Sequence, residues 1–322
     1  MWLGIGIGGA ALLVHSLFYF IYVEFLTRKG VQRIKSGYFE LTDTRNANIW
    51  IMGDSHPMLA LNPDSLGSAF NWAGTSEYYF LSLAKLKSAL KTRQPKPEII
   101  ILPLDLHSFS AQGNALLLQH ELDDAYWVGL LNYDYLRNQK LPKDYLRWWI
   151  SAKFFPYAGQ YYRLLSFWKP EPYTFQPNGF CSVSDNFARF TSSERQALAS
   201  LRYQSHFGKF PVLDSLQVNA LKECKLICKN EGIQLVFLSF PVSDEYWEIA
   251  AGNAELRTIQ TLQKECIEGH HWLDFSKAFS NKPDYFSDPD HLNAQGAALL
   301  SSMVSKEFQK FRKKPVAAPP GT

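Results

Sequence analysis

Four short runs of nearly continuous apolar residues, separated by segments with helical periodicity, constrain this 322-residue chain most strongly. A strand that is apolar on both faces has to be covered on both faces, as in a parallel sheet between two layers of helices. The expected strands are 48–52, 98–105, 233–240 and 272–275, and the expected helices are 76–91, 215–230, 254–267 and 294–312. The pattern predicts an α/β domain whose ligands lie beyond the carboxyl ends of the strands.

Two of these helices carry boundary signals. Gly232 follows the helix 215–230 directly, where a residue with a left-handed backbone commonly ends a helix. Asn293 precedes the helix 294–312, and its side-chain oxygen can accept a hydrogen bond from the first helical turn.

Composition and motifs narrow the classes of function. Thirty-three basic residues against thirty acidic ones give a net charge of +3, which does not indicate nucleic-acid binding. There is no Gly-x-Gly-x-x-Gly, no Gly-Lys-Ser/Thr and no Cys/His spacing of a zinc site, so we expect no cofactor and no metal. The four cysteines are either buried thiols or include one disulfide.

The N-terminal segment predicts a membrane anchor. Residues 1–23 contain no charged side chain, and at about 1.5 Å per residue they span about 33 Å, enough for a hydrocarbon core of about 30 Å. We therefore expect a single transmembrane helix over 1–27 rather than a cleaved signal peptide. A juxtamembrane linker over 28–44, a catalytic domain over 45–312 and a disordered tail over 313–322 would follow.

The basic residues after this segment bear on its orientation. Arg28, Lys29, Arg33 and Lys35 follow the apolar run, and no basic residue precedes it. By the positive-inside bias alone, the large domain would lie in the cytoplasm.

The residues suited to catalysis follow the first strand and precede the last helix. Ser55 comes directly after a strand, and Asp288 and His291 stand three residues apart in the loop before the helix 294–312. A serine hydroxyl needs a base to remove its proton, and a histidine base needs a carboxylate to orient it. The sequence predicts a triad of Ser55, His291 and Asp288, with Asp290 as the second choice of carboxylate.

Acyl chemistry also needs donors for a developing oxyanion. The backbone N–H of Ser55 is one candidate, and the Asn71–Thr75 segment offers a second, in which Gly74 brings an N–H close and Asn71 orients the loop. Asp54 is assigned to the same oxyanion and substrate-binding set.

The loop after the strand 98–105 is a further source of such a donor. Asp105, His107 and Ser108 remain equal alternatives for that role. His56 is too close to Ser55 in sequence to act as its base, and we interpret His107 and His206 as structural or surface residues.

An aromatic-rich insertion interrupts the alternation of strands and helices at about 110–215. Residues 126–175 hold sixteen aromatic side chains in fifty positions. One interpretation is an insertion with its own small core. The other is a cap over the active site, or a surface that meets a glycan, the membrane or a partner.

The motifs Gly53-Asp54-Ser55, Asn71 with Gly74, and Asp288-x-x-His291-Leu-Asn resemble the SGNH/GDSL hydrolase superfamily over residues 45–110 and 215–312. The resemblance implies a three-layer α/β/α sandwich of the flavodoxin-like type and a Ser-His-Asp site. The family's Gly-x-Asn-Asp block is missing here, and Pro103-Leu-Asp-Leu-His-Ser108 stands in its place.

With the missing Gly-x-Asn-Asp block and the N-terminal segment, the chain resembles the membrane-anchored branch typified by DltD, AlgJ and AlgX. This resemblance implies a bacterial inner-membrane protein with an extracytoplasmic domain, against the charge bias. It also implies transfer of acyl groups to an envelope or secreted polysaccharide, with a multi-pass membrane-bound O-acyltransferase as the supplier. A carbohydrate esterase and a non-catalytic binding partner for the glycan or the acyltransferase are the alternatives.

Overall fold

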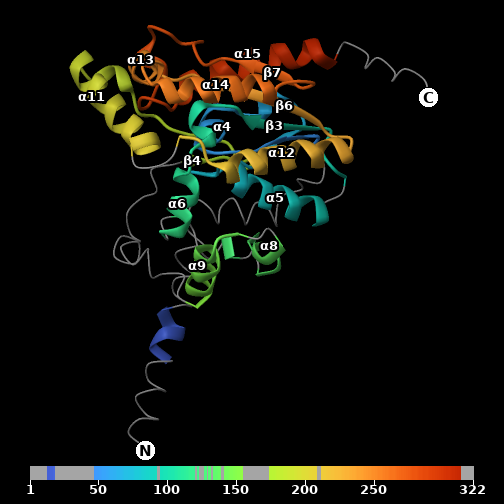
Figure 1. Ribbon diagram of the computed structural model, residues 1–322. Helices are drawn as coiled ribbons and strands as arrows, with labels where there is room; N and C mark the ends of the chain where they lie inside the picture. Colours follow the sequence, from blue (N-terminus) through green and yellow to red (C-terminus); the bar gives the residue numbers. More distant parts are fainter. Residues whose placement is uncertain are drawn as a thin grey trace, which may run out of the picture.

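The computed structural model describes residues 13–18, 47–92, 95–119, 122, 127–128, 130–131, 133–138, 141–154, 174–208 and 212–312. Within them the chain forms an α/β domain around a five-stranded parallel sheet (Figure 1). The strands of this sheet are β1 (Ile49–Ile51), β2 (Ala69–Asn71), β3 (Ile99–Pro103), β6 (Gln234–Ser239) and β7 (His271–Asp274). Their order, β2-β1-β3-β6-β7, is the flavodoxin-like doubly wound order, so the predicted α/β fold with a central parallel sheet is confirmed.

Helices cover both faces of the sheet. The helices of the described residues are α4 (Ser55–Ala60), α5 (Tyr79–Thr92), α6 (Gln112–Leu118), α8 (Tyr133–Asn138), α9 (Lys143–Phe154), α11 (Ser192–Tyr203), α12 (Ser215–Asn230), α13 (Asp244–Ala251), α14 (Ala254–Cys266) and α15 (Ala294–Arg312). A small antiparallel pair, β4 (Thr174–Phe175) and β5 (Cys181–Ser182), lies outside the main sheet.

Successive side chains of the strands point into two separate cores. In β1, Trp50 packs on the side of α5 and α12, whereas Ile49 and Ile51 pack on the side of α4 and α15. Figure 1 shows the strands between α5 and α12 on one side and α15 on the other. This alternation explains why the strands read as continuous apolar runs: both of their faces are buried.

The sequence located most elements to within a few residues. Four of the five strands and the helices α5, α12, α14 and α15 lie where they were expected. Gly232 follows α12 with φ +68°, and the side chain of Asn293 accepts hydrogen bonds from the N–H groups of Gln295 and Gly296 at the start of α15. The edge strand β2 was not predicted, because its sequence Ala-Phe-Asn forms no continuous apolar run, whereas the equally short β1 reads Ile-Trp-Ile.

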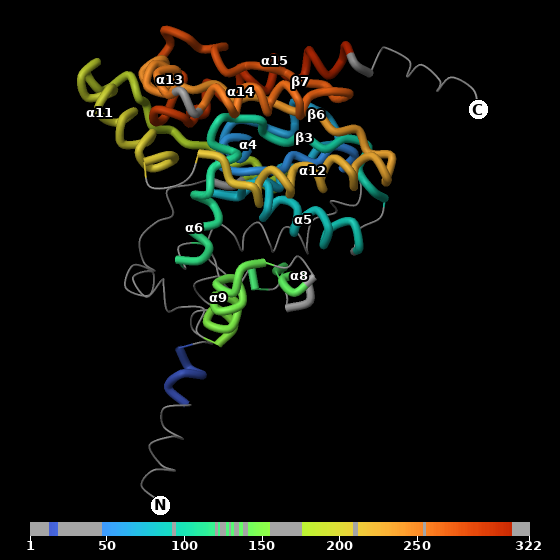
Figure 2. The backbone as a smooth tube through the Cα atoms, in the orientation of Figure 1, coloured from blue at the N-terminus to red at the C-terminus, as the bar shows by residue number. Residues whose placement is uncertain are grey.

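Several aromatic residues of the insertion belong to the main core. Trp127, Tyr145 and Trp148 are buried in the cluster on the α5 side of the sheet, and the ring of Tyr145 lies edge-on to Phe80 of α5. In Figure 2, α8 and α9 lie beyond α5, on the side of the molecule away from α15. These residues therefore act as core and do not cap Ser55. Trp168 lies outside the described residues.

Several predictions concern segments that lie largely outside the residues that the structure describes. Of the expected anchor only residues 13–18 are described, and the linker 28–44 and the tail 313–322 are not. Within the described part of the chain, no helix combines the length and apolarity required to cross a membrane. Of the two alternatives for the cysteines, buried thiols or one disulfide, the structure shows the first. All four are buried free thiols: Cys181, Cys224, Cys228 and Cys266.

Candidate active site

A sharp turn between β1 and α4 places Ser55 at the carboxyl edge of the sheet. Gly53 adopts φ +120°, and a Cβ atom built on it would lie 2.4 Å from Cδ of Pro103, so only glycine fits. Asp54 then caps α4 by accepting a hydrogen bond of 2.9 Å from the N–H of His56. Ser55 is thus the first residue of α4.

The loop before α15 places His291. Oδ1 of Asp288 accepts hydrogen bonds from the N–H groups of Asp290 (3.1 Å) and His291 (3.0 Å), which folds the loop back on itself. This turn allows Oδ2 of the same carboxylate to reach the ring of His291 at 2.9 Å. The three-residue spacing between the two side chains therefore works as the sequence suggested.

Ser55, His291 and Asp288 form a continuous hydrogen-bonded chain. Nε2 of His291 lies 2.7 Å from Oγ of Ser55, and Nδ1 lies 2.9 Å from Oδ2 of Asp288. A carboxylate only accepts hydrogen bonds, so the proton of a neutral His291 ring resides on Nδ1 and Nε2 is free to accept from the hydroxyl. The structure thus brings together the three residues predicted as a triad, in the geometry that a general base requires.

Arg202 joins the two carboxylates of this loop. Its side chain, from α11, lies 3.0 Å from Oδ2 of Asp288 and 2.8 Å from Oδ1 of Asp290. The Asp288 side chain is 34% exposed, whereas that of Asp290 is 1% exposed. Asp290 also lies 3.6 Å from Nδ1 of His291, so Asp288 has the closer contact and Asp290 stands behind it.

A second Asp–His–Asp chain lies buried directly behind the triad. Nδ1 of His56 is 2.8 Å from Oδ2 of Asp105, and Nε2 is 3.3 Å from Oδ2 of Asp290. Burial alone would lower the pKa of His56, but the two flanking carboxylates raise it well above its ordinary value. Burial alone would raise the pKa of Asp290, yet the neighbouring His291 and Arg202 hold it well below its ordinary value.

Two more histidines complete this buried cluster. Nε2 of His107 lies 2.9 Å from Oδ2 of Asp54, and the rings of His107 and His206 stack with centroids 4.6 Å apart. Burial would raise the pKa of Asp54, but His107 and His56 lower it to about 2. His206 bonds through Nδ1 to the hydroxyl of Tyr246, and burial together with His107 lowers its pKa well below the ordinary value.

The expected oxyanion donors are placed unequally. The N–H of Gly74 donates to the carbonyl of Gly53 at 2.8 Å, so it is already engaged. Asn71 is buried; its side chain donates to the carbonyls of Pro57 and Leu61 and accepts from Ala73, which is the loop-orienting role expected for it. Ser55, as the first residue of α4, has an N–H with no acceptor inside its own helix.

The other assigned and alternative positions have structural partners as well. The carboxylate of Asp54 accepts from the N–H of His56 at the start of α4 and bonds to His107. The carboxylate of Asp105 bonds to His56 and accepts from the N–H of Phe240. Oγ of Ser108 accepts from the N–H of Asp105. Of the two backbone N–H groups considered first, that of Gly74 is engaged by Gly53, so that of Ser55 is the one left available.

The same clustering gives two sets of potential metal ligands. Donor atoms of Asp54, His56 and His107, and those of His56, Asp290 and His291, lie within 4.8 Å of one another in each set. In the structure these side chains already have hydrogen-bond partners, His107 at Asp54 and His56 at Asp105 and Asp290, and the second set shares His291 with the triad. We assign no metal to either set.

The sequence missed the buried cluster in two different ways. Asp54, His56, Asp105 and His107 all follow the ends of β1 and β3, where polar residues of a parallel sheet converge, so position alone could have indicated them. Other members come from the insertion: Arg202 lies in α11, and His206 lies in the π-helical turn Gln204–Gly208 that continues it. No sequence signal connects these two residues with the sheet edge.

No family model and no curated protein matches this chain. Among solved structures it is similar to a GDSL-like lipase from Bacteroides thetaiotaomicron, at 7% identity and a TM-score of 0.42, covering 88% of this chain and 98% of that one. A structure of a proposed acylhydrolase from Bacteroides fragilis is similar at 8% identity and a TM-score of 0.42, covering 87% and 96%. Function is therefore inferred from the residues of this chain's own site.

Proposed function

We propose that this chain is a serine-dependent acyl-transfer enzyme that works through an acyl-Ser55 ester. The observation that carries the proposal is the contact of 2.7 Å between Oγ of Ser55 and Nε2 of His291, whose other nitrogen faces Asp288. Nucleophile, base and orienting carboxylate are the parts that covalent acyl transfer needs.

The first half of the reaction transfers the acyl group to the enzyme. Oγ of Ser55 attacks the acyl carbonyl while Nε2 of His291 takes the hydroxyl proton. The carbonyl oxygen becomes negative, and the N–H of Ser55 is the candidate donor of a hydrogen bond to it. When the donor ester bond breaks, the leaving oxygen takes the proton from Nε2, and the acyl-Ser55 ester remains.

The second half transfers the acyl group onward. An acceptor hydroxyl gives its proton to Nε2 of His291 as its oxygen attacks the acyl-Ser55 carbonyl. Breakage of that ester returns the proton to Oγ of Ser55 and restores the enzyme. Asp288 stabilises the protonated ring in both halves, and Arg202 holds the Asp288 carboxylate in position.

We propose further that the acceptor is a hydroxyl of a cell-envelope or secreted polysaccharide and that a multi-pass membrane-bound O-acyltransferase supplies the acyl group. The uncharged segment 1–23 and the resemblance to the DltD, AlgJ and AlgX branch support this proposal. They also support an inner-membrane anchor with the domain outside the cytoplasm. An esterase that removes acyl groups from such a polymer uses the same residues and is the alternative.

Labelling of the full chain with a fluorophosphonate probe tests the core of the proposal. The wild type should be labelled at one residue, identified as Ser55 by peptide mass. Ser55→Ala and His291→Ala should both abolish labelling, while Ser65→Ala, in the 3-10 helix Pro63–Ser65, should leave it intact. No labelling of a folded wild type would contradict an activated serine.

Partitioning of a bound acyl group then distinguishes transfer from hydrolysis. The enzyme would be acylated with p-nitrophenyl acetate and chased with buffer or with an oligosaccharide. A transferase should give acetylated oligosaccharide in excess over acetate and should hydrolyse its own acyl-Ser55 slowly. Free acetate alone, at a rate that the oligosaccharide does not change, would establish the esterase alternative.

A further inference from the structure

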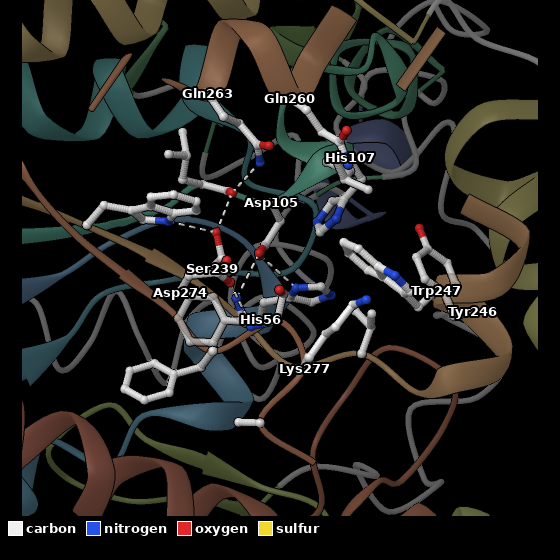
Figure 3. A pocket seen from close by; sticks show the side chains of 18 of the residues that line it. His56, Asp105, His107, Ser239, Tyr246, Trp247, Gln260, Gln263, Asp274 and Lys277 are labelled. Atoms are coloured by element: carbon white, nitrogen blue, oxygen red, sulfur yellow. Dashed lines mark hydrogen bonds and ion pairs between the residues drawn. The ribbon is translucent and has the colours of Figure 1, made fainter. Parts of the chain in front are cut away.

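A separate cavity of about 650 Å³ lies beyond the carboxyl ends of β3, β6 and β7. Its floor is formed by His56 and Asp105, so it abuts the buried chain behind the triad, but neither Ser55 nor His291 lines it. Figure 3 shows these two side chains at its base, with Gln263 of α14 on one side and Trp247 of α13 on the other. Its volume is in the range of ordinary small-molecule sites.

The inner wall of the cavity offers apolar surface rather than free polar groups. Oγ of Ser239 and Nε2 of Gln263 both donate to the carbonyl of Leu104, at 2.8 and 2.6 Å, and Nε1 of Trp272 donates to Oγ of Ser239. Asp105 is bonded to His56 and to the N–H of Phe240. Along this wall a sugar ring would therefore lose its hydration without gaining matching partners, although Gln260 and Asp274 line the cavity elsewhere.

The remaining wall suits an alkyl chain. Leu104, Phe240, Val242, Phe275 and Met303 contribute apolar side chains to the lining. Burial of hydrocarbon against such a wall is favourable for each methylene and needs no directional partner.

The mouth of the cavity is cationic. Lys264 and Lys277 line it and are both exposed, and Nζ of Lys277 lies 4.7 Å from the centre of the Trp247 ring. The exposed Asp274 also lines the cavity, but its Oδ1 is bonded to the N–H of Ser276. An anionic head group at the mouth would thus meet two ammonium groups while its chain fills the interior.

We propose that this cavity is a second ligand site, distinct from Ser55, that binds the alkyl chain of a carboxylate amphiphile with its anionic group at Lys264 and Lys277. The site does not depend on the proposed acyl-transfer function, because the residues that form it take no part in the chemistry at Ser55. Its occupant would contact His56, and the ring of His56 packs against the ring of His291, the proposed base.

Calorimetric titration of the full chain with decanoate and octanoate tests this proposal, with detergent held constant. Decanoate should bind about fifteenfold more tightly, because each methylene contributes about fourfold. Decylamine should bind at least tenfold more weakly than decanoate. Equal affinity for decanoate and decylamine, or no binding of decanoate to the folded wild type, would overturn the proposal.

Matched variants locate the binding. Lys277→Ala should weaken decanoate binding about three- to tenfold. Lys282→Ala, which removes another lysine stacked on an aromatic ring but outside the cavity, should not. Ala278→Trp should block the cavity, whereas Ala251→Trp, at an exposed position of α13, should leave binding unchanged, with thermal melts to verify folding.

Blocking the nucleophile separates this site from the candidate active site. Decanoate should bind Ser55→Ala as tightly as it binds the wild type. Loss of binding in Ser55→Ala, or undiminished binding in Ala278→Trp, would place the ligand at Ser55 and refute a second site.

Discussion

Two Asp–His arrangements lie side by side at the carboxyl edge of the sheet, and they differ in what surrounds them. The rings of His291 and His56 are 5.3 Å apart and nearly perpendicular. His291 faces a serine hydroxyl and a carboxylate that is 34% exposed, whereas His56 lies between two carboxylates that are 7% and 1% exposed. The Asp–His pair of His291 therefore lies in a half-exposed site, and that of His56 lies in a buried one. We call these two residues the half-open and the closed histidine.

This difference indicates which of the two histidines can take up and release a proton in each catalytic cycle. A general base has to take and release a proton in each cycle, so it needs a reacting partner and a pKa near the working pH. His56 is held between two carboxylates, which raise its pKa well above the ordinary value and so favour the charged form of the ring. We therefore propose that His291 serves the chemistry, while His56 is a positioning residue that holds the ends of β1 and β3 to the loop before α15.

Exchange of each histidine for glutamine gives the largest expected effect. His291→Gln should reduce the rate of fluorophosphonate labelling at least about thousandfold, because no base remains next to Oγ of Ser55. The same change at His56 should mainly lower stability, because two buried carboxylates lose their cation. Labelling kinetics and urea unfolding of both variants measure the contrast.

An inverse pattern would refute this division of roles. If His56→Gln lost labelling as a fully folded protein while His291→Gln kept it, the buried ring would be the base. A double variant Ser55→Ala/His291→Ala should hydrolyse a p-nitrophenyl ester no more slowly than either single variant, since such residues act as one unit.

The buried carboxylate gives the next largest effect. Asp290→Asn removes the charge that faces His56, His206 and Arg202, and it should lower the free energy of unfolding by about 3–5 kcal/mol. Urea unfolding measures this loss, and Asp284→Asn, in the exposed stretch nearby, is the control with an expected change of under about 0.5 kcal/mol. An unaltered unfolding midpoint in Asp290→Asn would show that the cluster is not held by this charge.

The sequence predicted the fold well because the fold depends on patterns within short segments. A buried parallel strand shows itself as an apolar run, and a helix shows itself by its period and by caps such as Asn293. The edge strand β2 was missed because Ala-Phe-Asn is not a continuous apolar run, although its side chain at Asn71 was singled out for the loop.

The candidate site was predicted in part for a physical reason. Ser55, Asp288 and His291 come from segments at the ends of the domain that the parallel topology brings to one edge, and the structure places them together. Arg202 and His206 were not predicted, because the path of the insertion decides their position. The engagement of the Gly74 N–H by Gly53 likewise depends on a hydrogen bond between loops that no local pattern reveals.

Loss of the Asp288 carboxylate should slow fluorophosphonate labelling less than loss of Ser55 or His291. Asp288→Asn should slow labelling about ten- to hundredfold, because Asp290 still lies 3.6 Å from Nδ1 of His291 and keeps the ring paired. Stability should change by less than about 1 kcal/mol, as for other half-exposed ion pairs. Labelling rates of this variant and of a folded Asp290 variant compare the two carboxylates, and a silent Asp288→Asn would reassign the orienting role to Asp290.

The smallest effect is the pH dependence of stability, and it follows from opposite pKa shifts of two buried histidines. The pKa of His206 is depressed, so the unfolded chain binds the proton first as the pH falls below about 6.5, and stability decreases towards acid. The pKa of His56 is raised, so its contribution is complete below about 6.5 and is lost as the pH rises towards its folded pKa. Asp54, with a pKa of about 2, adds a further loss between about pH 4 and pH 2.

Together these shifts predict a stability maximum near pH 6.5, with limbs no steeper than about 1.4 kcal/mol per pH unit for each histidine. Urea unfolding midpoints at pH 5, 6.5 and 8 measure the two limbs. His206→Gln should flatten the acid limb and leave the alkaline one, and His56→Gln should do the reverse. Stability that rises steadily from pH 5 to pH 8 in the wild type would mean that His56 is not held charged between Asp105 and Asp290, and the contrast between the closed and the half-open histidine would fail on its closed side.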